Sequence, residues 1–455
     1  MVYDLIILGG GPAGYNAAAH ASKEGMTVLL FEKNELGGVC LNEGCIPSKT
    51  LLNSAKIFHY VKHSENYGVN VQDKGHVSQS AVIDRKNKVV KRLATGVRSR
   101  LKAAKVEVIK SHAEIQAKTS DGFTVLSEGT MYSGKNLLIA TGSAPIIPDI
   151  KGVREGLQEG FLLTNREILD LTEIPEKLVI VGAGVIGLEM ADYYSSVGSQ
   201  VTVIEMVNKI AGETDEKVSA VLQKALEKKG VVFKLNSRVT EFKSGVVVFE
   251  DNGESVALPA DKALLSIGRR AVTDGFGLEN LGIKTERGAI ITDEKLHTNL
   301  SGVYAAGDVN GKMMLAHTAY REGEVAVNNM LGNPDEINYD AIPSVIYTTP
   351  EVAAVGMNLA TAKSRGMQAK EVTLSLMYSG RYIAENTDYT GFCQLVYNEG
   401  NGTLVGAHII GNYASEYIVA VSNLIDLQID VQRIKKLVFP HPTVCEVIRE
   451  AVFEL

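Results

Sequence analysis

The chain has 455 residues, enough for about three domains of ordinary size, so its stability requires neither a disulfide framework nor a structural metal. With 46 basic and 53 acidic residues its formal net charge is −7, which argues against phosphate-backbone binding as the main activity. Four cysteines exclude a disulfide-rich secreted scaffold, and no apolar run approaches the ~20 residues of a membrane-spanning helix. The N-terminus, MVYDLIILGG, begins directly as a strand pattern without the features of a signal peptide. We therefore expect a cytoplasmic protein that binds neither membranes nor nucleic acid.

The first predicted elements form a nucleotide-binding unit. Residues 3–8 are an apolar strand pattern that ends at a turn containing Gly9, Gly11 and Gly14. An alanine-rich helical segment follows, and then a second apolar run that ends at Glu32. In such a unit the glycines permit a tight turn, close approach of the backbone to a pyrophosphate, and helix–strand packing. Free N–H groups at the helix start bind the phosphates and the acid accepts hydrogen bonds from a ribose, so the segment predicts a dinucleotide site.

A cysteine pair follows in the segment GGVCLNEGCIPSKTLLNSAK. Cys40 and Cys45 lie five positions apart, which on an ideal helix is too far for easy bridging. A disulfide here would need local distortion, and such disulfides are typically reducible and functional. Pro47 suits a first helical turn, so we expect the pair near a helix N-terminus, which lowers the pKa of a thiol. Metal binding is disfavoured because no matching Cys or His lies nearby, and two inert buried thiols are the alternative to a redox pair.

The nucleotide-binding pattern then recurs. The segment KLVIVGAGVIG supplies Gly182, Gly184 and Gly187, and VTVIE ends at Glu205, each 173 residues after its counterpart in the first unit. Two complete copies with acids in register indicate two dinucleotide sites. An acid in this position prefers a free 2′-hydroxyl and repels a 2′-phosphate, and the following MVNK contains no arginine. The second site therefore predicts NAD rather than NADP.

The last pattern lies near the C-terminus, in FPHPTVCEVIREAV. A histidine such as His441 can take a proton from a thiol near neutral pH. Glu446, five residues on at a predicted helix start, could fix its tautomer and raise its basicity. Taken alone, a His-Pro dipeptide in a loop is structural more often than catalytic. Cys393, in the strand-like run GFCQLVY, is expected in the core.

Taken together, GGVCLNEGCIPSK, the doubled glycine motif, YAAGD and HPTVCE resemble the pyridine nucleotide–disulfide oxidoreductase family over essentially the whole chain. Within it, the resemblance is greatest to the members that oxidise dihydrolipoamide. It implies an α/β fold with two Rossmann-like dinucleotide-binding domains and a C-terminal α+β dimerisation domain. The implied domains are FAD-binding over residues 1–146 and 269–337, NAD-binding over 147–268, and dimerisation over 338–455.

The resemblance also implies site residues. Cys45 resembles the cysteine packed against the flavin and Cys40 the one that exchanges with substrate. Lys49 would pair with Glu189, and the His441–Glu446 dyad would serve the flavin site of the other subunit of a homodimer. The implied FAD contacts are Gly9, Gly11, Gly14, Glu32, Lys49, Ala113, Thr141, Gly142, Asp308 and Ala316. The implied NAD contacts are Gly182, Gly184, Gly187, Glu189, Glu205, Val239 and Gly268.

The implied reaction oxidises protein-bound dihydrolipoamide to lipoamide through a Cys40–Cys45 disulfide and FAD, and reduces NAD⁺ to NADH, contributing to cell redox homeostasis. The implied partner is the lipoyl-carrying domain of an acyltransferase in a 2-oxoacid dehydrogenase, or an H-type protein of glycine cleavage. No metal is expected. Several residues depart from the family pattern. Phe439, Thr318, Ala271 and Val272 are expected to touch substrate or partner surfaces. Cys445, an unusual neighbour for the dyad, is expected to be a small packing residue.

Three alternatives share much of this pattern. A glutathione-type reductase has the same scaffold but usually prefers NADPH, which Glu205 opposes. An NADH oxidase or CoA-disulfide reductase would use a single active cysteine. A non-catalytic dinucleotide-binding subunit would bind FAD without thiol turnover, which the intact cysteine pair and dyad disfavour.

Overall fold

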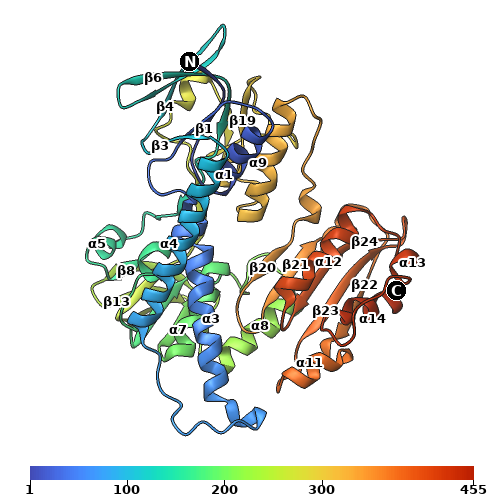
Figure 1. The fold of residues 1–455 in the computed structure, drawn as a ribbon. Helices are drawn as coiled ribbons and strands as arrows, with labels where there is room; N and C mark the ends of the chain where they lie inside the picture. The colour runs from blue at the N-terminus through green and yellow to red at the C-terminus, as the bar shows by residue number, and fades with distance from the viewer. The chain divides into compact units, whose positions relative to one another are not determined.

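The computed structural model describes residues 1–455, which divide into two compact units (Figure 1). Each unit is assembled from three separate segments of the chain. The first unit contains Met1–Thr50, Ile83–Ile146 and Gly268–Ile337. The second contains Leu51–Val82, Ile147–Ile267 and Asn338–Leu455.

The first unit is built on a mixed sheet whose central strand is β1 (Val2–Leu8). Strands β2 (Val28–Phe31) and β6 (Thr130–Ile139) flank it in parallel, and the strand order is β3-β2-β1-β6-β5-β4, with β19 also pairing β6. Residues 5–7 of β1 are completely buried, as expected for a parallel strand covered on both faces. The other strands are β3 (Glu107–Ile109), β4 (Glu114–Thr119), β5 (Gly122–Ser127) and β19 (Val303–Ala305).

Two helices of the first unit lie side by side beside this sheet, α1 (Pro12–Lys23) and α9 (Ala316–Met330) (Figure 1). Pro12 opens α1 at a position where its missing N–H costs nothing. Gly323 allows the close approach, since a Cβ there would lie 2.7 Å from the carbonyl oxygen of Ala13. The 25-residue helix α4 spans Gln79–Ala103.

The second unit contains a parallel sheet that repeats the arrangement, in the order β11-β10-β9-β15-β8. Its strands are β8 (Leu162–Leu163), β9 (Lys177–Val181), β10 (Gln200–Ile204), β11 (Val232–Lys234) and β15 (Lys262–Leu265). Helix α7 (Val185–Val197) follows β9, as α1 follows β1. An antiparallel sheet of β12 (Arg238–Lys243), β13 (Val246–Asp251) and β14 (Glu254–Pro259) is inserted before β15. The prediction of two Rossmann-like arrangements is confirmed.

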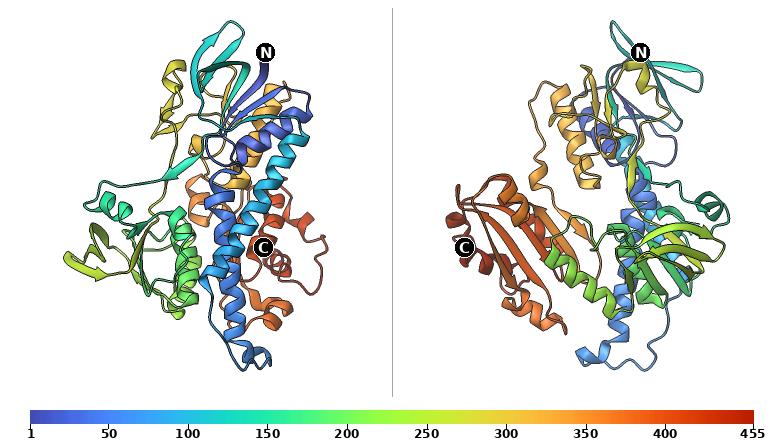
Figure 2. Two further views of the ribbon diagram at one scale, coloured as in Figure 1. Left: turned by 60° about the vertical axis from the view of Figure 1, so that its left-hand side comes forward. Right: turned by 180° about the vertical axis from the view of Figure 1, so that it is seen from behind.

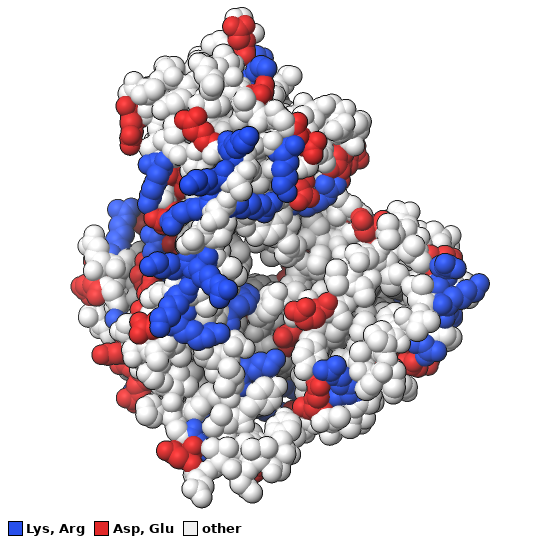
Figure 3. Space-filling model, in the orientation of Figure 1, with Lys and Arg blue, Asp and Glu red and all other residues white.

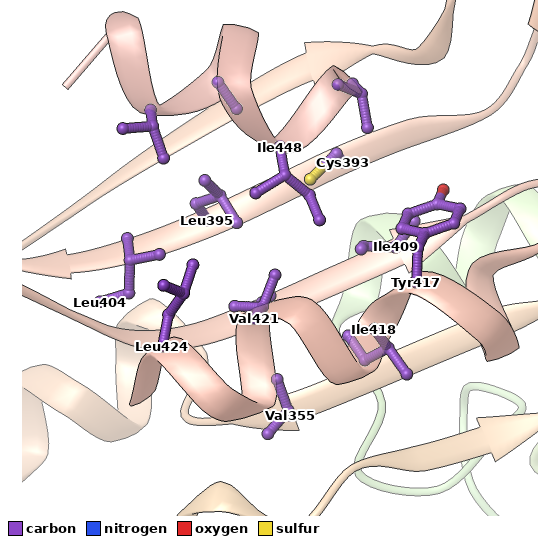
Figure 4. Close-up of a cluster of buried hydrophobic side chains, with 14 of the residues drawn as sticks. Val355, Cys393, Leu395, Leu404, Ile409, Tyr417, Ile418, Val421, Leu424 and Ile448 are labelled. Carbon is purple, nitrogen blue, oxygen red and sulfur yellow. The ribbon is translucent and has the colours of Figure 1, made fainter. Parts of the chain in front are cut away.

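The second unit also contains an antiparallel sheet in the order β20-β21-β24-β23-β22, seen from behind in the right-hand view of Figure 2. Its strands are β20 (Ser344–Ile346), β21 (Val352–Gly356), β22 (Ala369–Ser375), β23 (Phe392–Asn398) and β24 (Thr403–Ile410). Helices α12 (Ala414–Asp426) and α14 (Glu446–Phe453) pack on it. Cys393 is fully buried in this core beside Ile448, as predicted (Figure 4). The predicted C-terminal α+β arrangement is thereby confirmed.

The remaining helices and strands, most of them short, lie between the elements described above. They are α2 (Gly38–Glu43), β7 (Ser143–Pro145), α5 (Val153–Gln158), α6 (Asn165–Ile168), α8 (Glu216–Lys228), β16 (Arg269–Ala271), β17 (Thr285–Glu286), β18 (Ala289–Ile290), α10 (Leu359–Ser364), α11 (Gly380–Glu385) and α13 (Val431–Ile434). Helix α3 (Cys45–Lys62) carries the second predicted redox cysteine at its first residue. None of the helices combines the length and apolar character needed to cross a membrane.

Candidate redox and dinucleotide sites

The two glycine turns are held by the same hydrogen bond. The backbone N–H of Gly10 donates to Oε2 of Glu32 over 2.7 Å, and that of Ala183 donates to Oε2 of Glu205 over 2.7 Å. These residues correspond across the 173-residue repeat. The predicted acids therefore lie against the glycine turns in both units.

Some glycines in these turns are required by the protein itself. A Cβ on Gly9 would lie 2.2 Å from the carbonyl oxygen of Ala140, and one on Gly14 would lie 1.8 Å from that of Gly9. Gly187 is equally confined in the second unit, because a Cβ would lie 2.2 Å from the carbonyl oxygen of Gly182. These positions are explained by packing between a strand end and the following helix.

Gly11 and Gly184 are different, because protein packing does not require them. A Cβ on Gly184 would meet no atom within 4 Å, and one on Gly11 would meet its nearest atom at 3.7 Å. Both residues are N-caps that supply no side-chain acceptor to α1 and α7. The helix N-termini therefore face open space with free N–H groups, the arrangement that receives a pyrophosphate. The geometry of both turns fits a bound dinucleotide.

The segment after β6 and the loop after β19 meet around Ser143. Its hydroxyl donates to Asp308, and it accepts a 2.8 Å hydrogen bond from Nε of Arg269. Arg269 also donates to the carbonyl oxygen of Ser143 over 2.9 Å. Asp308, predicted to contact FAD, is thus oriented by a hydroxyl that an arginine holds in place.

A buried carboxylate on α9 also stabilises the loop that carries Asp308. Glu322 on α9 has no exposed surface and accepts from the backbone N–H of Gly307 over 2.5 Å and from Nδ2 of Asn310 over 2.9 Å. Its two oxygens therefore fix the turn that presents Asp308. No motif in the sequence indicated Glu322, although a charged residue at 0% exposure signals such a role once the structure is known.

The remaining predicted FAD contacts lie in the first unit. Thr141 donates from its hydroxyl to the carbonyl oxygen of Val272 over 2.6 Å, and Gly142 has a φ of +73°, which favours glycine. Ala113 is buried, and Ala316 is the first residue of α9, as predicted. One expectation is wrong. Thr318 is only 1% exposed and its hydroxyl has no protein partner, so it does not lie on the protein surface.

All but one of the remaining predicted NAD contacts lie in the second unit. Glu189 on α7 is 3% exposed and accepts from the backbone N–H of Tyr347 over 3.0 Å. Val239 is buried in β12. Gly268, with a φ of +117°, is instead the first residue of the last segment of the first unit. Lys49 belongs to the first unit, whereas Glu189 belongs to the second, so the pairing of the two stays a prediction.

The two cysteines come from two helices rather than one. Helix α2 carries Cys40 and ends at Gly44, whose φ of −145° and ψ of −114° break the helix before α3 begins at Cys45. A Cβ on Gly44 would lie 2.9 Å from the carbonyl oxygen of Val39, so the break requires glycine. Both cysteines are free thiols joined by a side-chain hydrogen bond. The helix break supplies the local distortion that the spacing demands.

The expected lowering of the thiol pKa is wrong for Cys40. The hydrogen bond with Cys45 raises the pKa of Cys40, and burial and the negative charge of Cys45 raise it further. The backbone N–H of Cys45, at the start of α3, lowers it as expected, but this effect is the weaker one. Cys40 therefore keeps its proton while the pair is reduced.

Two tyrosines that no motif indicated lie near the pair. The hydroxyls of Tyr15 on α1 and Tyr320 on α9 are 2.6 Å apart, and the rings meet edge to face. Burial and the hydrogen bond with Tyr320 raise the pKa of Tyr15, and an ionised Cys40 would raise it further. Burial also raises the pKa of Tyr320, and ionised cysteines would add to this rise. Both hydroxyls thus lie within electrostatic reach of the thiol pair.

The predicted dyad lies in the second unit. His441 is exposed, and its Nδ1 is 2.8 Å from Oε1 of Glu446, the first residue of α14. Oε2 of Glu446 accepts the backbone N–H of Thr443 over 2.9 Å. Burial raises the pKa of Glu446, but these two hydrogen bonds outweigh it and the pKa is lowered. The second ring nitrogen of His441 is left for a proton or a substrate.

The departures from the family pattern near this dyad are packing residues. Phe439 and Cys445 are partly buried against the core of the C-terminal sheet. Burial raises the pKa of the Cys445 thiol, which opposes its ionisation. No cluster of three or more His, Cys, Asp or Glu side chains could hold a metal ion.

The chain matches the pyridine nucleotide-disulphide oxidoreductase family over residues 3–323, and the dimerisation domain of the same family over residues 342–452. It belongs to this family. It is accordingly an oxidoreductase whose cofactors are FAD and NAD. The match to the dimerisation domain supports a homodimer.

Similar proteins span nearly the whole chain. It is 37% identical to the dihydrolipoyl dehydrogenase of Mycoplasma pneumoniae, with 99% of this chain and 98% of that protein covered. It is 36% identical to the dihydrolipoyl dehydrogenase of Geobacillus stearothermophilus, with 98% of this chain and 95% of that protein covered. Among solved structures, LpdA of Mycobacterium tuberculosis is similar, with a TM-score of 0.89, 26% identity and 99% of both chains covered.

Proposed function

We propose that this chain oxidises protein-bound dihydrolipoamide to lipoamide and reduces NAD⁺ to NADH, the activity for which its similar enzymes are named. The observation that carries the proposal is the thiol pair at the break between α2 and α3, in a chain with two dinucleotide-binding turns. A redox pair of cysteines together with two dinucleotides is suited to carry electrons between a dithiol and a pyridine nucleotide.

The chemistry begins with the pair oxidised to a disulfide. One substrate thiolate attacks the sulfur of Cys40, which breaks the Cys40–Cys45 bond and releases the Cys45 thiolate. The second substrate sulfur then attacks the first, which forms the substrate disulfide and releases Cys40. The substrate thereby loses two electrons and two protons, and the cysteine pair gains the electrons. His441 takes a proton from the substrate thiol, and Glu446 holds its imidazole in the tautomer that can do so.

The cofactors and their contacts follow from the two turns. When bound, FAD supplies the two-electron carrier between the reduced pair and NAD⁺. We assign its contacts to the predicted FAD residues of the first unit, with Lys49 beside it. We assign those of NAD to the predicted NAD residues, which lie in the second unit except for Gly268. The hydrogen bond from Ala183 to Glu205 favours NAD, because it holds a carboxylate at the second glycine turn, and a carboxylate there repels a 2′-phosphate. Lys209, the nearest following cation in sequence, is engaged with the carbonyl oxygen of Thr214.

The same proposal includes the domain roles and the partner. Residues 1–146 and 269–337 bind FAD, 147–268 bind NAD, and 338–455 form the dimer. The partner is a lipoyl-carrying domain of a 2-oxoacid dehydrogenase acyltransferase or a glycine-cleavage H-type protein. The protein acts in the cytoplasm, where reducing conditions keep surplus thiols such as Cys445 reduced.

Initial rates on the purified holoprotein test this function. Dihydrolipoamide with NAD⁺ is the main arm, and NADP⁺ with dihydrolipoamide, glutathione disulfide with NADPH, and NADH oxidation by air are the comparison arms. We expect fast NAD⁺ reduction by dihydrolipoamide alone. If only glutathione disulfide is turned over, the substrate of the enzyme is a disulfide other than lipoamide. Bound flavin without turnover in any arm would contradict an enzymatic role.

A further inference from the structure

Helix α4 carries a concentration of positive charge that the proposed chemistry does not use. Its 25 residues contain eight Lys or Arg side chains and one acid, Asp84, in a chain whose net charge is −7. Lys105 and Lys110 extend the charge beyond its C-terminus. Figure 3 shows Lys and Arg side chains gathered along the course that α4 takes in Figure 1.

These side chains are exposed, and most are not neutralised within the protein. Arg85, Lys88, Lys91, Arg92, Arg98, Arg100 and Lys102 are exposed, and we call them the basic face. Arg98 pairs with Glu35 over 2.5 Å, an acid that Lys110 shares. Lys88, Lys91 and Arg92 form no ion pair. Holding this many like charges on one helix is unfavourable unless an anionic surface covers them.

The basic face is hydrogen-bonded to α1, the helix that carries one of the two tyrosines near the thiol pair. Arg100 donates to Oδ1 of Asn16 on α1 over 2.8 Å, and Nδ2 of Asn16 donates to the carbonyl oxygen of Tyr320 over 3.1 Å. Tyr320 and Tyr15 form the hydroxyl pair beside the cysteines. All of these residues belong to the first unit, so hydrogen bonds connect the basic face to the tyrosine pair, and that pair lies within electrostatic reach of Cys40.

We propose that the basic face of α4 is the docking surface for the protein that carries the dihydrolipoyl arm, and that this carrier is acidic where it meets α4. The inference rests on the proposed function and deepens it by naming the chemistry of the partner. Opposite charge raises the rate of encounter and holds the partner while its flexible arm reaches Cys40. Nucleic acid is a poorer occupant, because α4 has no aromatic side chain to stack on a base and the chain is acidic overall.

A charge series of substrates tests this proposal on the holoenzyme. Three synthetic peptides each carry one dihydrolipoyl-lysine, flanked by glutamates, by glutamines or by lysines. With the native enzyme at low ionic strength, we expect kcat/KM to be highest for the acidic peptide and lowest for the basic one. At about 0.5 M salt the three values should converge, because exposed charges are then screened.

A triple variant and a matched control locate the effect. The test variant is Lys88→Gln, Lys91→Gln and Arg92→Gln, which removes three charges from the basic face outside the catalytic and cofactor residues. The control is Lys118→Gln, Lys224→Gln and Lys363→Gln, which removes three exposed charges elsewhere. We expect kcat/KM for the acidic peptide to fall about tenfold in the test variant only, since steering depends on local charge. Free dihydrolipoamide should be oxidised equally well by all three proteins.

Three results would count against the docking proposal or against the function on which it rests. Equal losses in both triple variants, or a flat peptide series in the native enzyme, would overturn the proposal. A duplex DNA or RNA that binds the native enzyme but not the test variant, with peptide rates unchanged, would assign the basic face to nucleic acid instead. Failure of the native enzyme on free dihydrolipoamide would contradict the proposed function itself, which is a separate result.

Discussion

The carboxylate of Glu446 accepts a hydrogen bond from Nδ1 of His441 over 2.8 Å while it also accepts the backbone N–H of Thr443. Because the pKa of Glu446 is lowered, this carboxylate stays charged at every pH above its ordinary value of 4.5. The imidazole therefore faces a fixed negative charge throughout the range in which a thiol donates its proton, and that charge holds Nδ1–H in place.

Glu446→Gln keeps the shape of the dyad and removes this charge. The amide of glutamine holds Nδ1–H of His441 less firmly, so the ring is less often in the tautomer that takes a proton at its other nitrogen. We expect kcat near neutral pH to fall about 100-fold, the lower range for general-base catalysis. Stopped-flow and steady-state rates with dihydrolipoamide measure this loss. An unchanged kcat in Glu446→Gln would remove Glu446 from the proton transfer.

The thiol pair predicts the same two effects for substitution of either cysteine. Cys45→Ser and Cys40→Ser should each abolish dihydrolipoamide oxidation, because neither variant can form the disulfide. Both should keep FAD, since the glycine turn and Asp308 are unchanged. Flavin absorbance after gel filtration and NADH production measure the two properties. Full activity in either variant would refute the proposed exchange.

Alanine substitutions at two glycines of the second turn should separate an effect on NAD⁺ binding from an effect on stability. Gly184→Ala places a methyl group in open space at the start of α7, where it would obstruct a pyrophosphate but no protein atom. We expect an unchanged unfolding temperature and a KM for NAD⁺ raised about tenfold, as for loss of one or two hydrogen bonds to a charged group.

Gly187→Ala, one turn further along α7, should behave in the opposite way. Its Cβ would lie 2.2 Å from the carbonyl oxygen of Gly182. Forcing the helix away should lower the free energy of unfolding by about 1–3 kcal/mol, the usual cost of overpacking. Denaturant unfolding of both variants makes the comparison. A destabilised Gly184→Ala protein would show that the space at this position is not free.

The buried carboxylate of Glu322 predicts a loss of both stability and flavin. In Glu322→Gln the side chain keeps one acceptor oxygen, but its NH2 group would face the other donor, either the N–H of Gly307 or Nδ2 of Asn310. We expect the free energy of unfolding to fall by about 1–3 kcal/mol and FAD to dissociate more readily, because the turn carrying Asp308 loosens. Glu286→Gln, on an exposed strand, is the control. Thermal melts with and without added FAD separate the two effects.

Much of this fold could be predicted from the sequence, because the dinucleotide unit has a local signature. The apolar strand, the glycine turn and the acid at the next strand end lie within about thirty residues. Their repetition after 173 residues, as in Glu32 and Glu205, made the prediction specific. The cysteine pair and the dyad could also be found, because their spacing is short and their chemistry is narrow.

The structure was needed for residues whose roles depend on distant contacts. Glu322 and Gly307 are fifteen residues apart, and nothing in the sequence shows that the carboxylate of Glu322 accepts the backbone N–H of Gly307. Tyr15 and Tyr320 meet across 305 positions, so their hydroxyl pair has no local signature. The pKa of Cys40 was wrongly predicted because a helix terminus is visible in the sequence, whereas burial and a hydrogen bond to Cys45 are not.

The hydrogen bond from Ala183 to Glu205 constrains any attempt to convert the enzyme to NADP⁺. The usual exchange of the acid for a small neutral residue would remove an acceptor that orders the glycine turn as well as the repulsion of a 2′-phosphate. Oε1 of Glu205 also accepts the backbone N–H of Val207 over 3.2 Å, so the following loop would loosen too. A redesigned coenzyme pocket therefore has to retain an acceptor at position 205, such as glutamine, and introduce its cation at a neighbour such as Val207.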